Sequence, residues 1–212
     1  NGGEFWANDS TYGANYLLNC SDANYDAKLA SIVVKGGKYF QFNPANNAAE
    51  GEGTNFLAEG YGSYYTVYDR NYYYEVKKPS EAVYSTKGNS VADYELIKNI
   101  FRHGGKLTIN EYITYGDISV TEALIADGVN VEITGAGEIY LKSGVSTIYE
   151  QGVVSAVICA KNGGTVTFND YSGYVDGGAN DYAVEVRDGG KVVINSGNFK
   201  GAVSAVYAVK GN

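Results

Sequence analysis

The feature that most constrains the fold is an internal repeat in the last third of the chain. A Gly-Gly pair followed by alternating apolar residues occupies segment 163–168 and recurs 26 positions later in segment 189–194. A shortened third copy follows in segment 206–212. The matching residues are Gly163, Gly164, Val166 and Phe168 with Gly189, Gly190, Val192 and Ile194. Repeats of about 20–50 residues are typical of solenoids and propellers, in which each repeat buries its apolar side against the next.

The same apolar pattern extends upstream with uneven spacing. Segment 107–109 (LTI) matches segment 131–133 (VEI) 24 positions later, and segment 166–168 (VTF) a further 35 positions on. In a parallel β-helix the strands stack coil on coil while insertions enter the turns, so spacing varies and the strand pattern persists. We therefore predict an all-β fold, a parallel β-helix, with an up-and-down β-barrel as the alternative.

The first forty residues carry a related motif. Segment 1–5 (NGGEF) is matched 34 positions later by segment 35–39 (KGGKY), which predicts one coil stacked on another. Segments 16–20 and 30–35 are rich in apolar residues and are expected to be strands. The polar segment 21–28 between them is expected to be a turn inserted into the coil.

A block dense in tyrosine follows. Segments 64–68 and 72–76 have strand-forming composition and flank residues 69–71, so we expect a terminal β-hairpin with a three-residue turn that covers the open end of the preceding coil. Strand alternation exposes about half of the tyrosines in such a hairpin. They serve either strand packing alone, or contact with another chain or with sugar rings. The residues concerned are Tyr61, Tyr64, Tyr65, Tyr68, Tyr72, Tyr73 and Tyr74.

One amphipathic helix is predicted over residues 91–102. Ser90 is the expected N-cap, and residues 103–105 (HGG) end the helix. The apolar face consists of Tyr94, Leu96, Ile97, Ile100 and Phe101. A single helix with such a face, placed ahead of a strand array, is expected to cover the start of that array.

These elements predict two modules. Residues 1–78 form the end of one array with its terminal hairpin, residues 79–89 form a linker, and residues 90–212 form a helix-capped array. The second array stops in the middle of the pattern with which the first segment ends, and the sequence contains no Met. We therefore expect a piece of a longer tandem or elongated protein.

Charge and composition narrow the classes of partner. The formal net charge is -8, whereas a nucleic-acid-binding protein needs a basic stripe to neutralise phosphates, so nucleic acid is not an expected partner. No apolar run approaches the roughly 20 residues of a membrane span, so membrane insertion is not expected. Cys20 and Cys159 lie in apolar contexts far apart in sequence, which favours buried free thiols over a disulfide.

Catalytic chemistry finds little support in the sequence. Enzymes built on β-helices carry carboxylates on an outer face, and Glu185, between two valines, is expected to point outward from a strand. His103 is the only histidine and stands at a helix end without a Ser or Cys motif. The remaining carboxylates considered, explained by turn geometry, are Asp170, Asp176, Asp181 and Asp188. We expect no enzyme activity, no cofactor and no metal site, with a polysaccharide hydrolase or lyase as the remote alternative.

Three stretches resemble known proteins. The glycine-rich ladder (GGTVTFND, DGGKVVINSGNF, SAVYAVKG) resembles the right-handed parallel β-helix repeats of phage fibre, tailspike and capsid-decorating proteins and of large surface proteins of gut bacteria. Segment 32–61 resembles a terminal segment that follows such repeats, and segment 93–134 resembles the helix-then-strand entry that begins them. No catalytic motif accompanies either segment.

The resemblance implies a structural protein outside the cell. We expect a component of an extracellular fibre or spike, foremost a phage virion protein of a tail or head fibre, on the virion surface or a bacterial cell surface. The expected partners are copies of itself in a homo-oligomer such as a trimer, together with a cell-surface glycan. The alternative is a carbohydrate-binding surface adhesin of a gut bacterium.

Overall fold

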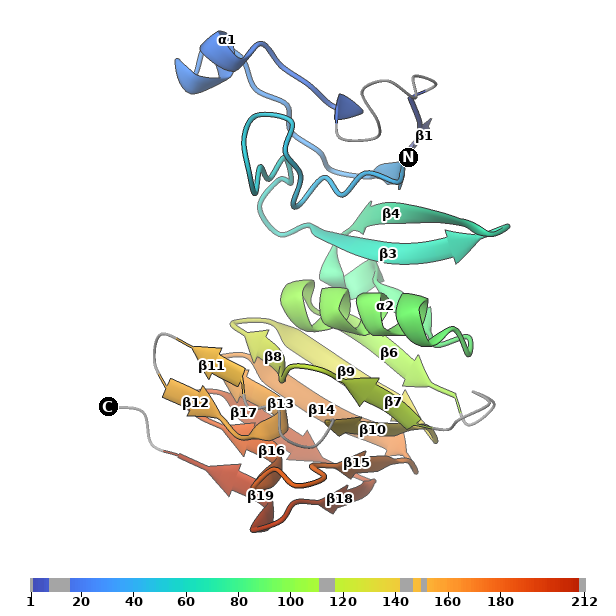
Figure 1. The fold of residues 1–212 in the computed structure, drawn as a ribbon, viewed down its shortest axis with the longest axis vertical. Helices are drawn as coiled ribbons and strands as arrows, with labels where there is room; N and C mark the ends of the chain where they lie inside the picture. The colour runs from blue at the N-terminus through green and yellow to red at the C-terminus, as the bar shows by residue number, and fades with distance from the viewer. Residues whose placement is uncertain (1, 8–15, 111–116, 142–146, 150–151, 210–212) are drawn as a thin grey trace. The chain divides into compact units, whose positions relative to one another are not determined.

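The computed structural model describes residues 2–7, 16–110, 117–141, 147–149 and 152–209. The protein is mainly β-structure, with two α-helices in the described residues (Figure 1). Its contacts divide the chain into two compact units, Asn1–Glu81 and Ala82–Asn212. The boundary differs from the predicted linker, because β5 (Val83–Ser85) already pairs in parallel with a strand of the second unit.

The first unit contains a four-stranded sheet in the order β1-β2-β4-β3. Its strands are β1 (Glu4–Phe5), β2 (Gly37–Phe40), β3 (Gly62–Tyr68) and β4 (Asn71–Lys77). β1 and β2 are parallel, and Phe5 lies opposite Tyr39, which confirms the pairing predicted from the 34-residue match. The β2–β4 and β4–β3 pairs are antiparallel, so the predicted hairpin is also present.

The hairpin turn is shorter than predicted. Tyr68 pairs with Asn71, which leaves Asp69 and Arg70 as the only turn residues between the strands. Their φ angles are 46° and 63°, the left-handed values of a type I′ turn, whose twist suits a two-residue hairpin. The prediction of three turn residues was wrong because Asn71 continues the ladder as the first residue of β4.

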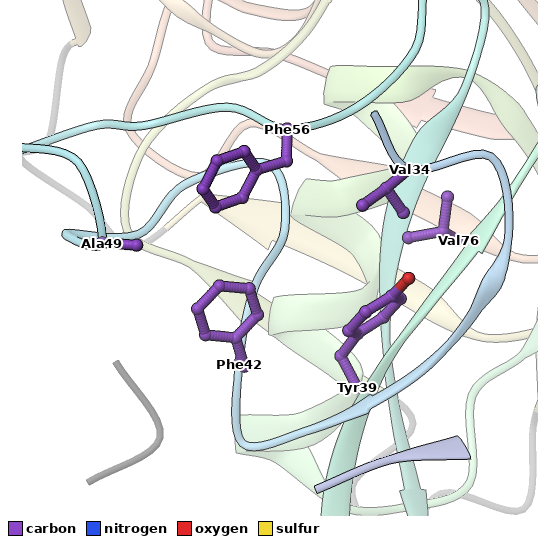
Figure 2. Packing of buried hydrophobic residues seen from close by; sticks show 6 residues of the cluster. All are labelled: Val34, Tyr39, Phe42, Ala49, Phe56 and Val76. Carbon is purple, nitrogen blue, oxygen red and sulfur yellow. The ribbon is translucent and has the colours of Figure 1, made fainter. Parts of the chain in front are cut away.

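The strands predicted over residues 16–20 and 30–35 are absent from those described segments. A short helix, α1 (Asp22–Asp26), lies where a turn was expected, and Val34 forms only an isolated bridge with Leu57. The apolar residues of this region pack into a side-chain cluster instead of a ladder (Figure 2). The buried members of the cluster are Val34, Tyr39, Phe42, Ala49, Phe56 and Val76.

The second unit contains three parallel sheets, and the chain passes through them in the same order four times. The first sheet comprises β5, β6 (Gly105–Ile109), β9 (Asn130–Gly135), β14 (Thr165–Tyr171) and β17 (Lys191–Ile194). The second comprises β7 (Asp117–Val120), β10 (Glu138–Leu141), β15 (Tyr174–Asp176) and β18 (Asn198–Lys200). The third comprises β8 (Leu124–Asp127), β13 (Ala156–Lys161), β16 (Tyr182–Val186) and β19 (Ser204–Ala208). Each circuit of three strands is called a level below.

The register confirms two of the three repeat spacings and corrects the third. Segment 131–133 pairs with 166–168, and 166–168 with 192–194, as predicted. Leu107, however, lies opposite Ile133 and not Val131, so that step is 26 residues and not 24. Apolar alternation has a period of two, so a shift of two residues leaves the pattern of faces unchanged and cannot be detected from it.

Side chains inside the levels form continuous buried rows. In the first sheet, Leu107, Ile133 and Phe168 are fully buried. Helix α2 (Ser90–His103) packs on the first level, in contact with β6, β7 and β8. Its buried apolar residues are Leu96, Ile97, Ile100 and Phe101. The apolar face of the helix is thus buried against these three strands.

The start of α2 lies one residue earlier than predicted. Asn89, and not Ser90, is the N-cap, and its side chain accepts a hydrogen bond of 3.1 Å from the backbone N–H of Ala92. Asp93 is buried one turn into the helix and accepts the backbone N–H groups of Lys87 and Gly88 at 2.9 and 2.8 Å. The helix start is therefore joined to the preceding loop by the carboxylate as well as by the cap.

The repeated Gly-Gly pair has two separate steric causes. Gly163 and Gly189 adopt left-handed φ angles of 79° and 75°, which side chains disfavour. At the next position, a Cβ on Gly164 would lie 2.2 Å from the carbonyl oxygen of Ala126 on β8. A Cβ on Gly190 would lie 2.2 Å from the carbonyl oxygen of Ala160 on β13. The pair therefore marks the point where the chain turns tightly against the level before it.

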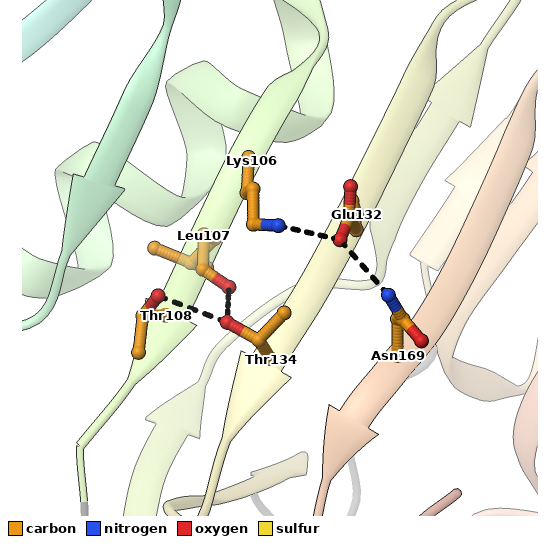
Figure 3. Close-up of polar contacts among 6 residues, drawn as sticks. All are labelled: Lys106, Leu107, Thr108, Glu132, Thr134 and Asn169. Atoms are coloured by element: carbon orange, nitrogen blue, oxygen red, sulfur yellow. Dashed lines mark hydrogen bonds and ion pairs between the residues drawn. The ribbon is translucent and has the colours of Figure 1, made fainter. Parts of the chain in front are cut away.

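The outer surface of the first sheet carries polar side chains in register (Figure 3). Lys106 Nζ lies 2.7 Å from Glu132 Oε1, and Asn169 donates to the same oxygen at 3.4 Å. The hydroxyls of Thr108 and Thr134 are 2.9 Å apart. The hydrogen bond from Lys106 is the main reason why the pKa of Glu132 lies below its ordinary value. Polar pairs on this face alternate with the buried apolar row on the other.

Candidate functional site

A row of aromatic residues crosses the four-stranded sheet of the first unit, with at least one residue on each strand. The register places Phe5 opposite Tyr39, Tyr39 opposite Tyr74, and Tyr74 opposite Tyr65. Phe5 and Tyr39 stack with centroids 4.8 Å apart, and Tyr65 and Tyr74 meet edge to face at 5.5 Å. Tyr72 extends the row, because its ring stacks on Tyr65 at 5.6 Å and 19°. These five residues are called the aromatic row.

Strand alternation and one glycine build the row. Tyr72 and Tyr74 are two positions apart on β4, so they share a face of the sheet. At the other end Gly37 has a φ of 109°, and a Cβ there would lie 2.8 Å from the ring of Phe5. Gly37 therefore leaves the space in which Phe5 lies against Tyr39.

Burial varies along the row. Tyr39, in the middle, is 3% exposed, and its hydroxyl donates to the carbonyl of Gly36 at 2.9 Å. Burial raises the pKa of Tyr39 above its ordinary value. Phe5 and Tyr72, at the two ends, are 39% and 37% exposed. The row is therefore anchored in the core of the unit and offers apolar surface at each end.

The structure brings three of the predicted contact tyrosines together and separates the others. Tyr65, Tyr72 and Tyr74 belong to the aromatic row. Tyr73 is on the opposite face of the sheet, where its ring lies 5.4 Å from that of Phe40. Tyr68 shares that opposite face by alternation along β3 and is highly exposed beside the hairpin turn.

The two other tyrosines predicted as contact residues, Tyr64 and Tyr61, pack against residues of the protein itself. Tyr64 is fully buried, so its ring is not available at the surface, and burial raises its pKa. Tyr61 precedes β3 and packs against the buried cluster of the first unit, with Lys78 Nζ 5.9 Å from its ring centroid. The exposure of each hairpin tyrosine thus depends on the face of the sheet that it occupies and on the residues that cover that face.

Phe5 and Tyr39 were missed as site residues by sequence reasoning. The matched motifs that contain them, NGGEF and KGGKY, predicted that their strands stack. A parallel pairing in that register already places the two aromatic residues side by side. The signal was therefore present in the sequence, in the last residue of each motif.

Glu185 is the clearest correction among the catalytic candidates. Its carboxylate does not point into solvent but is 1% exposed, and it accepts hydrogen bonds from the guanidinium of Arg187. Arg187 also donates to the carbonyl of Val153 at 3.2 Å. Val153 belongs to β12 (Gly152–Val154), which pairs with β11 (Thr147–Tyr149) in a hairpin inserted between β10 and β13. The inserted hairpin contributes to covering a face that the repeat pattern alone leaves open.

The aspartates expected in turns differ in their positions: Asp188 lies in a turn, whereas Asp170 lies within β14 and Asp176 is the last residue of β15. Asp176 accepts the backbone N–H of Gly178 at 2.7 Å and Lys200 Nζ at 3.1 Å. Asp170 and Asp188 have left-handed φ angles of 48° and 49°. In the described part of the chain, no cluster of three or more His, Cys, Asp or Glu side chains is placed to hold a metal ion.

The remaining reactive side chains are His103 and the two cysteines. Burial and the charge of Arg102 lower the pKa of His103 to about 4, so it is neutral at physiological pH. Cys20 and Cys159 are free thiols. Burial raises the pKa of Cys159 to about 12, which keeps it protonated and unreactive.

A cleft of about 320 Å³ lies near the end of the row where Phe5 is found, and it is lined partly by residues of β1, β2 and β4. Lysines and glutamates line it in equal number, and two ion pairs join four of them, with Lys38 3.8 Å from Glu4 and Lys77 3.0 Å from Glu75. Paired charges of both signs do not give a strong field for an ionic ligand. The cleft therefore adds little chemistry to the aromatic row.

No family model, curated protein sequence or solved structure matches this chain. Within the described residues, none of the helices has the length and apolar character required to traverse a lipid bilayer. In the first unit the stacked rings of the aromatic row provide rigid apolar area with polar tips.

Proposed function

We propose that the protein is a structural component of an extracellular fibre or spike and that its second unit is a right-handed parallel β-helix. The observation that carries the proposal is the fourfold passage of the chain through three parallel sheets in register. Backbone hydrogen bonds between levels and continuous apolar rows inside them make such an array stiff and resistant to proteases.

The proposed partner is another copy of the chain, and the aromatic row is the proposed contact surface. Tyr72 and Phe5 expose apolar area at the ends of a row whose centre is fixed by burial of Tyr39. Aromatic residues of this kind are enriched at protein interfaces because they supply large area at low entropic cost. The resemblance of the ladder to phage fibre and tailspike repeats makes a tail or head fibre of a virion the first assignment.

A carbohydrate-binding surface adhesin is the second candidate. It is favoured by the partly exposed Tyr72, whose ring is held in place by stacking on Tyr65, because sugar rings stack on exposed aromatic side chains. A polysaccharide-degrading enzyme loses support, because Glu185 is buried against Arg187. An acid of that kind has no access to a glycosidic bond.

Tyr72→Ala, with Tyr68→Ala as its matched control, separates these functions. Both tyrosines are exposed on the same hairpin, but Tyr68 lies on the face without the row. For the fibre, sedimentation should find a self-associating wild type, weakened about tenfold by Tyr72→Ala and unchanged by Tyr68→Ala. For the adhesin, a monomer should bind a glycan array and lose binding in Tyr72→Ala alone. A monomer that binds no glycan would overturn both.

A further inference from the structure

The last described level of the second unit is an open layer. The inner row of the first sheet, fully buried through three levels, ends at Ile194, which is 42% exposed. The equivalent row of the third sheet ends at Val206, which is 38% exposed. The buried members of these rows are Leu107, Ile133 and Phe168, and Leu124, Ile158 and Val184. Helix α2 covers the first level, whereas the described residues place nothing comparable on the last.

The strands of this last level also have open hydrogen-bonding edges. β17, β18 and β19 are each the terminal strand of their sheet in the described part of the chain. On β17, Lys191 N–H donates to Gly164, and Asn195 N–H, just beyond it, donates to Phe168. Val192 lies between these bonded positions, and backbone groups of alternate residues point to opposite sides of a parallel strand. Its N–H is therefore directed to the open edge.

The first unit has a strand that complements this edge. β1 ends its sheet and pairs on the β2 side alone among the described strands. Gly3-Glu4-Phe5 repeats the order of glycine, charged residue and apolar residue found in segment 190–192 (GKV). Its charge is opposite, because Glu4 stands where Lys191 stands in β17. Phe5 and Val192 occupy the apolar position of their motifs.

Pairs of Lys and Glu across neighbouring parallel strands are already used in both units. Lys38 on β2 lies 3.8 Å from Glu4 on β1, and Lys106 on β6 lies 2.7 Å from Glu132 on β9. Lys191 is exposed on the outermost strand of the same sheet as Lys106. A glutamate on the next strand would reproduce the arrangement of the first two levels.

We propose that β1 of a second copy of this chain adds in parallel to β17, with Glu4 opposite Lys191 and Phe5 opposite Val192. The proposal rests on the proposed function as an assembling fibre component. Chain direction agrees, because β1 is followed by β2 as β14 is followed by β17, so the strand order β14, β17, β1, β2 continues one parallel sheet across two copies. Such a head-to-tail joint is heterologous and generates open chains of copies unless its rotation closes a ring.

Charge reversal at the two ends tests the joint by sedimentation velocity over a concentration series. Wild type should form a ladder of oligomers. Glu4→Lys alone and Lys191→Glu alone each set like charges against each other and should weaken association roughly tenfold. Mixing the two variants should restore it, because every joint in a chain of alternating variants again sets a lysine against a glutamate. Glu52→Lys and Lys87→Glu, at exposed positions away from both edges, are the matched controls and should associate like wild type.

A backbone variant tests strand addition independently of charge. Val192→Pro removes an N–H that faces the open edge and leaves the bonds of β17 to β14, so the chain should stay folded while association through this joint is lost. Far-UV circular dichroism and thermal unfolding verify folding.

Failure of the joint between β1 and β17 can be distinguished from failure of the fibre proposal. Wild-type association that none of these three variants changes would overturn the joint and leave the fibre proposal standing, as would a mixture that fails to recover. A wild type that stays monomeric at every concentration would overturn both.

Discussion

Phe5 and Tyr39 stack with ring planes 6° apart and centroids 4.8 Å apart, although 34 positions separate them in the sequence. Tyr39 also packs against Phe42, whose ring centroid lies 6.4 Å away. One buried side chain thus connects the short strand β1 to the core of the first unit. The aromatic row depends on this connection, because β1 has only two residues with which to hold its place.

Tyr39→Ala should therefore lower the stability of the first unit sharply. Removing a buried aromatic ring costs about 3–5 kcal/mol, and here it also removes the stack that holds Phe5. Tyr68→Ala, at a site that is 77% exposed, should change the unfolding free energy by less than about 0.5 kcal/mol. Urea unfolding followed by near-UV circular dichroism measures the unfolding free energy of both variants. Equal losses of unfolding free energy in the two variants would contradict the assignment of Tyr39 to the core.

The first and second positions of the Gly-Gly pairs should respond differently to substitution. Gly190→Ala places a Cβ against a carbonyl of the previous level and should cost roughly 1–3 kcal/mol. Gly163→Asn should be nearly neutral, because a Cβ there meets nothing within 4 Å and Asn tolerates left-handed φ angles. Thermal unfolding of the two variants compares them, and a destabilised Gly163→Asn would show that space is not the deciding factor.

The buried pair of Glu185 and Arg187 should be more costly to break than to replace. Arg187→Ala leaves a carboxylate that is 1% exposed without its guanidinium, which is expected to cost about 3–5 kcal/mol. The double variant Glu185→Gln, Arg187→Met removes both charges and should retain most of the wild-type stability. The denaturant midpoints of the single and double variants measure this difference in stability. If the double variant is as unstable as the single one, packing and not charge dominates this site.

His103 should make the second unit less stable in acid. Its folded pKa of about 4 lies below the value of about 6.5 in an unfolded chain, so the unfolded state binds the proton first as pH falls. The stabilisation is complete above pH 6.5 and is lost progressively between about 6.5 and 4, by on the order of 2–3 kcal/mol. Unfolding free energies of wild type and His103→Gln measured across this range should diverge. Parallel curves would exclude His103 as the cause.

The two thiols should differ in reactivity. Cys159 is fully buried with a pKa raised to about 12, whereas Cys20 is partly exposed. A thiol reagent at pH 8 should therefore modify one cysteine rapidly in the native protein and the second only on unfolding. Cys20→Ser identifies the fast site, since native Cys20→Ser protein should show no rapid reaction. Rapid labelling of that variant would mean that the third sheet opens locally around Cys159.

Much of the second unit was predictable because matching residues of successive repeats lie opposite each other on neighbouring strands. The Gly-Gly pairs and the apolar residues two and four positions after the second glycine of each pair sufficed to place Val166 opposite Val192. The same reasoning failed at Leu107, where alternation allowed a slip of two residues. Glu185 could not be placed from the repeat, because its burial involves a hairpin inserted elsewhere in the chain.

The first unit was less predictable because long-range packing overrides local propensity there. Segment 30–35 has strand-forming residues, yet Val34 contributes a side chain to a cluster and makes only an isolated bridge. The hairpin was found because two strands close in sequence need only a turn between them. The aromatic row needed the additional information that β1, β2 and the hairpin join one sheet.

The loss of burial from Phe168 to Ile194 has a consequence for how the array moves. Levels in a stacked array are stabilised by their neighbours, so a level with one neighbour opens more often than a level with two. Amide hydrogens of β17, β18 and β19 should exchange with solvent before those of β9 and β14, and the difference should shrink when another layer covers them. Among the described levels, the last is therefore expected to open most often, and a layer added to it would take over that property.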